Sequence, residues 1–159
     1  MILFPNRKNF YLIILIISMI SIISALYIEY ILQYEPCKLC IYQRLPYIAA
    51  ILISFIGINY SNNDQILIIT IMVFVFSTII SGYHFGIENN LFDEISACVN
   101  DSLDISNKSK LLESLNQSMP VNCKDATFKI LGVSLAAINT ILSVLIVIFS
   151  IRTLTYEKN

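Results

Sequence analysis

Two cysteines three positions apart carry the most distinctive chemistry in this sequence. Cys37 and Cys40 enclose Lys38 and Leu39 in a Cys-x-x-Cys pair, which can close a small disulfide ring and reopen it by thiolate exchange. Arg44 follows Cys40 by four residues, so in a helix the two side chains share one face. A fixed positive charge one turn away favours the thiolate form of a cysteine. The pattern therefore predicts a redox-active dithiol.

A second pair of cysteines, Cys98 and Cys123, lies in the most polar part of the chain. Taken alone, this pair is best interpreted as a structural disulfide, which would stabilise a loop of that length by about 3 kcal/mol. Taken together with the first pair, it suggests a second function, in which the two pairs exchange electrons. Pro120, shortly before Cys123, predicts an extended and exposed approach to that cysteine.

A Cys-x-x-Cys pair is also half of many zinc sites, so a metal site is the competing interpretation. Structural zinc takes four ligands, commonly with a second close pair. Here the other two cysteines are far apart, and the chain has one histidine, His84. We therefore expect no resident metal. His84 and Glu88 are spaced for a helical pair near the cysteines, although polar residues that simply end an apolar segment would look the same.

The composition indicates a membrane protein. Of the 159 residues, 57% are hydrophobic and 13% charged, whereas about a quarter of the residues in soluble domains are charged. So few charged groups cannot cover a water-facing surface. The net charge of −1 provides no basic field for nucleic acid, and four glycines leave little room for a nucleotide-binding glycine fingerprint.

Four apolar segments are suited to cross a bilayer as helices, which takes about 20 residues each. We place these spans at about 10–30, 41–58, 66–83 and 130–151. The first has a basic start but no small-residue cleavage site, so we interpret it as a retained span. The second includes the polar pair Gln43 and Arg44, and Pro46 predicts that its helix either starts near Arg44 or bends there. The expected fold is a single all-α membrane domain, a four-helix bundle.

The number of spans determines which loops share a side of the membrane. With four spans, the cysteine-bearing loops at about 31–40 and 84–129 lie on one side and both termini on the other. Basic residues near the first span do not decide the orientation, because they are balanced across it. Paired cysteines persist in oxidising compartments, so we place the cysteine side outside the cytoplasm.

These features resemble the bacterial disulfide bond formation protein B (DsbB) family. The resemblance rests on Cys-Lys-Leu-Cys-Ile-Tyr-Gln-Arg at 37–44, on Tyr-His-Phe-Gly-Ile-Glu at 83–88, and on the cysteine pair before the last span. It covers nearly the whole chain. The resemblance implies a multi-pass inner-membrane enzyme that reoxidises a periplasmic, DsbA-like partner of the thioredoxin fold and reduces ubiquinone or menaquinone.

The resemblance also implies a role for each cysteine. The partner attacks the position of Cys98 and forms a mixed disulfide. Cys123 then attacks Cys37, and the released Cys40 thiolate contacts the quinone.

Three further positions can be compared with the family. Arg44 matches the arginine that supports quinone binding, and members carry a histidine near His84 with a less settled role. Some members carry Glu where Gln43 stands, so we assign Gln43 no role. The chain has no tryptophan, which leaves membrane-interface anchoring to Tyr and Phe.

Two other functions compete with this one. Quinone and vitamin K epoxide reductases also use membrane helices and two cysteine pairs, but there the loop pair precedes the Cys-x-x-Cys pair, and here it follows. The other is a non-catalytic membrane scaffold with a disulfide-pinned loop, which predicts static cysteines and no need for quinone.

Overall fold

The computed structural model describes residues 6–92, 129–130 and 133–156. This part of the chain contains five helices and one hairpin of two-residue strands. They are α1 (Arg7–Tyr30), α2 (Lys38–Tyr42), α3 (Leu45–Asn59), α4 (Asp64–Glu88), β1 (Lys129–Ile130), β2 (Val133–Ser134) and α6 (Leu135–Tyr156).

Four helical segments of the described chain are long and apolar enough to cross a membrane: Arg7–Tyr30, Lys38–Asn59, Asp64–Glu88 and Leu135–Thr155. The second segment combines α2 and α3. Helices satisfy all their backbone groups internally, which a lipid environment requires. The prediction of an all-α membrane four-helix bundle is confirmed.

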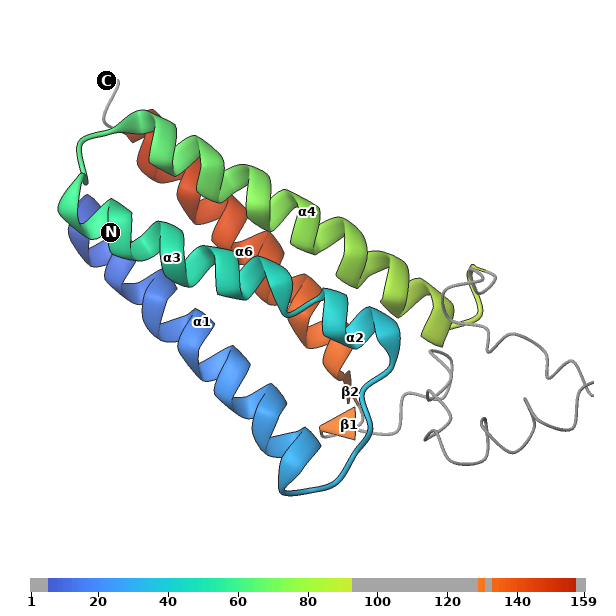
Figure 1. The fold of residues 1–159 in the computed structure, drawn as a ribbon. Helices are drawn as coiled ribbons and strands as arrows, with labels where there is room; N and C mark the ends of the chain where they lie inside the picture. The colour runs from blue at the N-terminus through green and yellow to red at the C-terminus, as the bar shows by residue number, and fades with distance from the viewer. Residues whose placement is uncertain (1–5, 93–128, 131–132, 157–159) are drawn as a thin grey trace, which may run out of the picture.

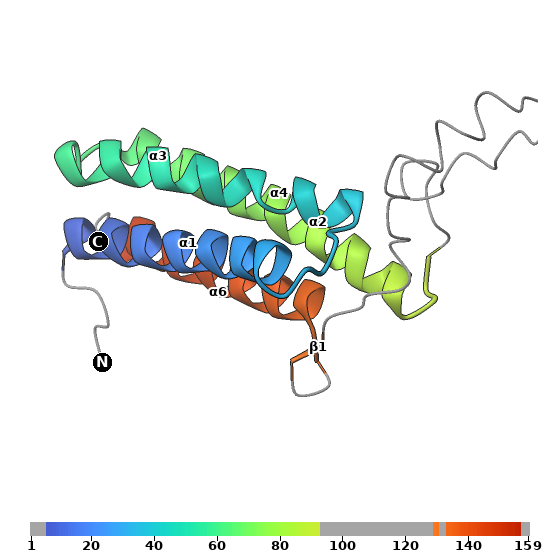
Figure 2. The same cartoon turned by 60° about the horizontal axis from the view of Figure 1, so that its bottom comes forward.

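The helices pack as two pairs. α1 packs along α3 and α4 along α6, and contacts between α3 and α4 join the pairs. In Figure 2, α3 and α4 form one layer, and α1 and α6 form the other. The start of α1 and the end of α6 lie at one end of the bundle (Figure 1). The end of α1, the start of α2, the end of α4 and the start of α6 lie at the other end, which we call the cysteine end.

The bundle buries small polar residues and exposes large apolar ones. Hydroxyl residues fill the interior at Ser18, Ser54, Thr70, Ser77, Ser81, Ser143 and Ser150. Ile23, Leu52 and Met72 are exposed. Small residues let helices approach closely where lipid supplies no hydrophobic driving force between them. The outer apolar surface therefore matches a lipid environment.

The second span is interrupted at Gln43 and Arg44. α2 ends at Tyr42, and α3 begins at Leu45 with Pro46 in its first turn. Proline has no N–H to donate, so it is tolerated at a helix start but not in an interior. Gln43, at this break, is buried at 8% exposed.

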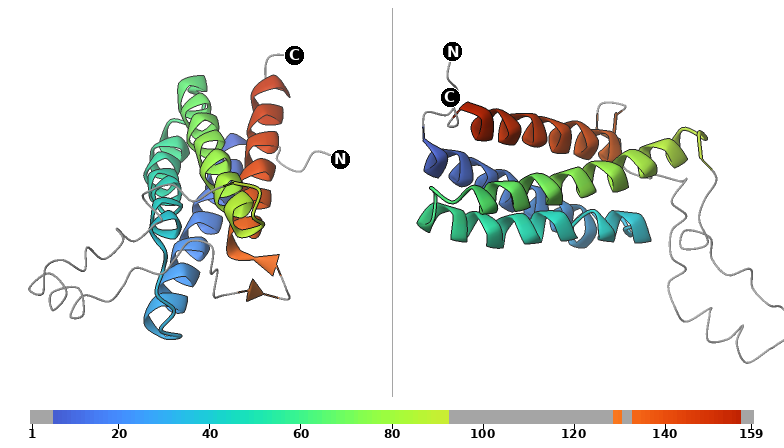
Figure 3. Two further views of the ribbon diagram at one scale, coloured as in Figure 1. Left: turned by 90° about the vertical axis from the view of Figure 1, so that its right-hand side faces the viewer. Right: turned by 90° about the horizontal axis from the view of Figure 1, so that it is seen from above.

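Two helix ends differ from the spans expected from hydropathy. α4 continues past Tyr83 to Glu88, because backbone hydrogen bonding does not depend on apolar side chains. α6 begins at Leu135 rather than at 130, since 129–130 and 133–134 pair as an antiparallel hairpin. The Ser134 hydroxyl accepts from the Ala137 N–H at 3.2 Å and caps the helix start. Figure 3 shows this hairpin joining α6 at the cysteine end.

Candidate functional site

The Cys-x-x-Cys pair forms the first turn of α2. Cys37 is the N-cap residue, in an extended conformation, and its sulfur accepts from the Cys40 backbone N–H at 3.3 Å. The two thiols are free, and their sulfur atoms lie 2.9 Å apart. Cys37 is 5% exposed, whereas Cys40 is half-buried. The pair is thus arranged to exchange between dithiol and disulfide, with one sulfur covered and the other partly accessible.

His84 of α4 lies against the covered sulfur. Its Nε2 is 3.7 Å from Cys37 Sγ, and the ring is 2% exposed. The hydrogen bond with the Cys40 thiol, followed by the contact with His84, lowers the pKa of Cys37 to about 4, against the opposing effect of burial. Hydrogen bonds to the charged form of a group favour that form. In this dithiol arrangement the negative charge therefore belongs to Cys37.

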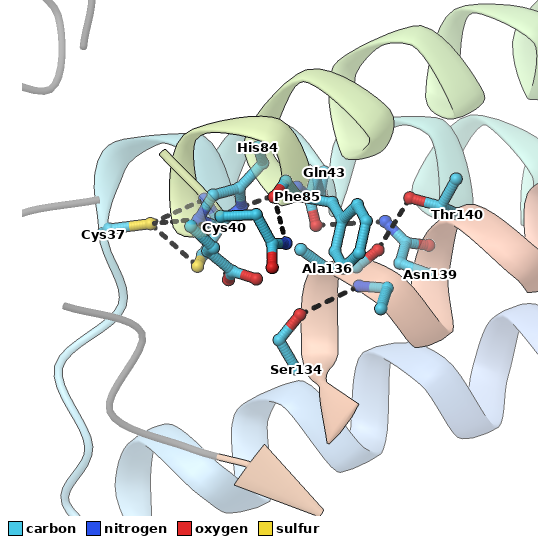
Figure 4. A network of polar contacts seen from close by, with 12 residues as sticks. Cys37, Cys40, Gln43, His84, Phe85, Ser134, Ala136, Asn139 and Thr140 are labelled. Atoms are coloured by element: carbon cyan, nitrogen blue, oxygen red, sulfur yellow. Dashed lines mark hydrogen bonds and ion pairs between the residues drawn. The ribbon is translucent and has the colours of Figure 1, made fainter. Parts of the chain in front are cut away.

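A chain of polar side chains leads from His84 into the bundle (Figure 4). His84 Nδ1 lies 2.8 Å from Gln43 Nε2, and Gln43 Oε1 accepts from Asn139 Nδ2 at 3.1 Å. Asn139 Oδ1 in turn accepts from the Tyr47 hydroxyl. Gln43, Tyr47 and Asn139 have no assignment from the sequence. For Gln43 and Asn139 the sequence held a signal, because amide side chains inside apolar spans are costly in lipid and tend to be functional.

Arg44 pairs with Glu29 near the end of α1. Its guanidinium forms an ion pair with Glu29, and the two side chains are 19% and 25% exposed. Gln43 and Arg44 keep right-handed helical backbone angles between α2 and α3, so the helical face expected for Arg44 and Cys40 stays a prediction. The structure places Arg44 at the cysteine end of the bundle.

Glu88 completes the surroundings of His84. Its Oε1 lies 3.6 Å from His84 Nε2, as the spacing of the two residues suggested. Its other oxygen, Oε2, is buried without a hydrogen-bond partner.

The sulfurs of Cys37 and Cys40 and a ring nitrogen of His84 lie within 4.8 Å of one another, so these three residues could hold a metal ion. Cys98 and Cys123 lie outside the described residues.

Comparison with known proteins gives a consistent assignment. Residues 7–153 match the family model of disulfide bond formation protein DsbB. An uncharacterised protein of Rickettsia prowazekii (strain Madrid E) is 30% identical over 155 residues, which cover 93% of this chain and 88% of that protein. Disulfide bond formation protein B of Psychromonas ingrahamii is 42% identical over 41 residues, covering 26% of this chain and 22% of that protein.

The family match covers the first three candidate membrane helices, all but the last two residues of the fourth, and the dithiol at the start of the second. The chain therefore belongs to the DsbB family and is a multi-pass inner-membrane disulfide oxidoreductase.

Proposed function

We propose that this protein is a thiol:quinone oxidoreductase that reoxidises a periplasmic, DsbA-like dithiol protein of the thioredoxin fold and passes the electrons to a membrane quinone. The net reaction converts one partner dithiol and one quinone into one partner disulfide and one quinol. Two electrons and two protons are transferred in each cycle. The quinone is ubiquinone or menaquinone, and a quinone is a strong enough acceptor for a partner as oxidising as DsbA.

The electrons pass through two cysteine pairs. A partner thiolate attacks Cys98 and breaks the loop disulfide, which releases a thiolate at Cys123. The second partner thiol then resolves the mixed disulfide at Cys98. Cys123 attacks the Cys37–Cys40 disulfide at Cys37, and exchange between the loop cysteines leaves the inner pair reduced. The dithiol then gives two electrons and two protons to the quinone and closes its disulfide again.

The arrangement of the inner dithiol carries this proposal. Its sulfurs lie 2.9 Å apart, and half-buried Cys40 stands at the start of a membrane-spanning segment, within reach of a quinone dissolved in lipid. Attack of Cys123 on Cys37 releases Cys40 as the thiolate that contacts the quinone. Arg44 and His84 are the proposed quinone-binding side chains.

The proposed orientation follows from the same chemistry. The cysteine end faces the periplasm, where a partner dithiol must be reoxidised, and both termini face the cytoplasm. Disulfides persist in oxidising compartments, which supports this orientation.

The test uses the full chain in detergent, a reduced thioredoxin-fold partner and a soluble quinone, with quinone absorbance as the readout. We expect one quinone consumed for each partner dithiol, and no turnover in Cys40→Ser. Gln65→Glu, at the opposite end of α4, serves as a control and should retain the wild-type rate. Turnover of Cys40→Ser at the wild-type rate would remove Cys40 from the mechanism.

The ligand geometry of Cys37, Cys40 and His84 favours zinc binding as a second candidate. Two thiolates and one imidazole form a known catalytic zinc set with an open fourth position. Metal analysis of the protein purified under reducing conditions distinguishes the oxidase from a zinc-binding protein. The oxidase predicts quinone turnover without stoichiometric zinc. A zinc protein predicts one zinc per chain, lost in His84→Ala, and no turnover.

A further inference from the structure

We propose that Gln43, Asn139 and Tyr47 act as positioning residues that set the tautomer of His84, so that its Nε2–H faces the sulfur of Cys37. The tautomer itself follows from the hydrogen-bond chain, whereas its use in electron transfer rests on the proposed function. The hydrogen-bond chain contains no cysteine. Three different helices contribute residues to it.

The polarity of the chain runs from Tyr47 toward the dithiol. The Tyr47 hydroxyl donates to Asn139 Oδ1, which leaves Asn139 Nδ2 to donate to Gln43 Oε1 at 3.1 Å. Gln43 Nε2 then faces His84 Nδ1 at 2.8 Å. An amide nitrogen only donates, so Nδ1 must present its lone pair. A neutral imidazole with a lone pair on Nδ1 carries its proton on Nε2.

The other side of the ring favours the same tautomer. Cys37 Sγ lies 3.7 Å from Nε2, and the Glu88 carboxylate lies 3.6 Å from it. Both groups accept hydrogen bonds when ionised. A proton on Nε2 therefore meets acceptors, whereas a proton on Nδ1 would face the Gln43 amide hydrogens.

The two amides are linked, so neither can turn alone. Turning Gln43 alone would direct its N–H groups at those of Asn139 and its carbonyl at His84. Because His84 is 2% and Gln43 8% exposed, water cannot replace a lost partner, and an unsatisfied buried polar group is costly. The orientation of Asn139 is thus transmitted through Gln43 to His84 (Figure 4).

A fixed donor at Nε2 has a direct use in the proposed cycle. It stabilises negative charge on Cys37 through a hydrogen bond, without proton transfer from the ring. The dithiol then holds a thiolate ready while the Cys40 proton stays between the sulfurs. In the opposite tautomer the ring would present a lone pair to Cys37 and repel the thiolate.

The chain has a single histidine, so ¹⁵N-histidine labelling of the full-length protein gives one imidazole signal pair. The spectrum of the reduced protein in detergent micelles distinguishes the two tautomers directly. We expect Nε2 protonated and Nδ1 unprotonated in the wild type. Protonation of Nδ1 in the wild type, alone or together with Nε2, would overturn the proposal.

Gln43→Glu tests whether the Gln43 amide sets the tautomer of His84. A carboxylate only accepts, so the proton should appear on Nδ1, and the signal of an unprotonated Nδ1 should be lost. Asn139→Ala removes the donor that orients Gln43 and should produce a mixture of tautomers. Gln65→Glu is the matched exposed control and should leave the wild-type spectrum unchanged.

The outcomes separate this inference from the proposed function. An unprotonated Nδ1 that persists in Gln43→Glu refutes the positioning chain, whatever the quinone assay gives. Absence of quinone turnover in the wild type refutes the oxidase and leaves the tautomer result intact. If Asn139→Ala does not fold, the histidine spectra of the wild type and of Gln43→Glu still test the positioning chain.

Discussion

Arg44 and Glu29 form an ion pair that joins the break in the second span to the last turn of α1. The Arg44 side chain is four-fifths buried, and the Glu29 carboxylate is its partner at the cysteine end. An arginine at a membrane boundary is costly unless it is paired or used. Glu29 therefore fixes the position of the one cation that the proposed function assigns to quinone binding.

Arg44→Ala should weaken quinone binding and leave attack by the partner intact. We expect the apparent KM for quinone to rise about tenfold, equivalent to about 1.4 kcal/mol, because a charge-assisted contact to a quinone oxygen is lost. Steady-state rates at varied quinone concentration measure KM, and trapping of the mixed disulfide measures partner attack. An unchanged KM would refute the role of Arg44.

Glu29→Gln provides a matched control for that variant. The amide oxygen can still accept from Arg44, so the guanidinium stays in place, and we expect a smaller change in KM than in Arg44→Ala. The double variant Glu29→Gln/Arg44→Ala should equal Arg44→Ala, since Glu29 acts through Arg44. An additive loss in the double variant would show that Glu29 acts independently.

The lowered pKa of Cys37 predicts how the reduced protein responds to acid. A thiol in an unfolded chain has a pKa of about 8.5, and the pKa of Cys37 in the fold is lowered to about 4. Because the folded value is the lower one, the stabilisation from this thiolate is complete above the unfolded pKa. It is lost as the pH falls through the folded value. The reduced protein should therefore lose stability on acidification as Cys37 takes up its proton.

Thiolate absorbance in the ultraviolet measures this titration. In reduced protein with both Cys98 and Cys123 replaced by serine, we expect a thiolate signal at neutral pH that disappears near pH 4. Adding Cys37→Ser should remove the signal at neutral pH, and His84→Ala should move the midpoint upward because one hydrogen bond to the thiolate is lost. A midpoint above neutrality in the wild-type inner pair contradicts the prediction.

The sequence predicts the fold better than it predicts the site, and the reason is distance along the chain. Span lengths are a local property, so four apolar segments were sufficient to predict the bundle. The contact between Gln43 and His84 joins residues 41 positions apart, and that between Gln43 and Asn139 joins residues 96 apart. No local pattern specifies such pairs. Gln43 was given no role because some members of the family carry Glu at its position.

Arg44 shows a second limit of sequence reasoning. Its ion pair joins it to Glu29, fifteen residues earlier in the chain and in another helix. Pro46 predicted a helix start or a bend near Arg44, but no local pattern specified this partner.

A hydroxyl pair between α4 and α6 predicts a small and measurable stability effect. Ser77 Oγ and Ser143 Oγ lie 3.0 Å apart and are buried. Hydrogen bonds between membrane helices contribute about 0.6 kcal/mol on average, so Ser77→Ala should lower the free energy of unfolding by about that amount. Unfolding in mixed micelles, followed by circular dichroism, measures the change. A loss several times larger would mean that the pair organises more than its own contact.

Two glycines in the bundle make a matched test of helix packing. At Gly57 an added Cβ would lie 2.7 Å from the ring of Tyr11, whereas at Gly82 the nearest atom is Thr140 Cγ2 at 4.0 Å. Tyr11 is fully buried between helices and has no free space to move into. Gly57→Ala should therefore force α1 away from α3 and destabilise the protein by about 1–3 kcal/mol.

Gly82→Ala should be neutral or stabilising, by up to about 1 kcal/mol, because alanine loses less conformational entropy than glycine in a helix. The two variants add the same methyl group to helices of the same bundle, so their difference isolates the contact with Tyr11. Unfolding of both in the same mixed micelles gives that difference directly. Equal stabilities would show that α1 adjusts to the added methyl at no cost, and that the close approach at Gly57 does not hold α1 against α3.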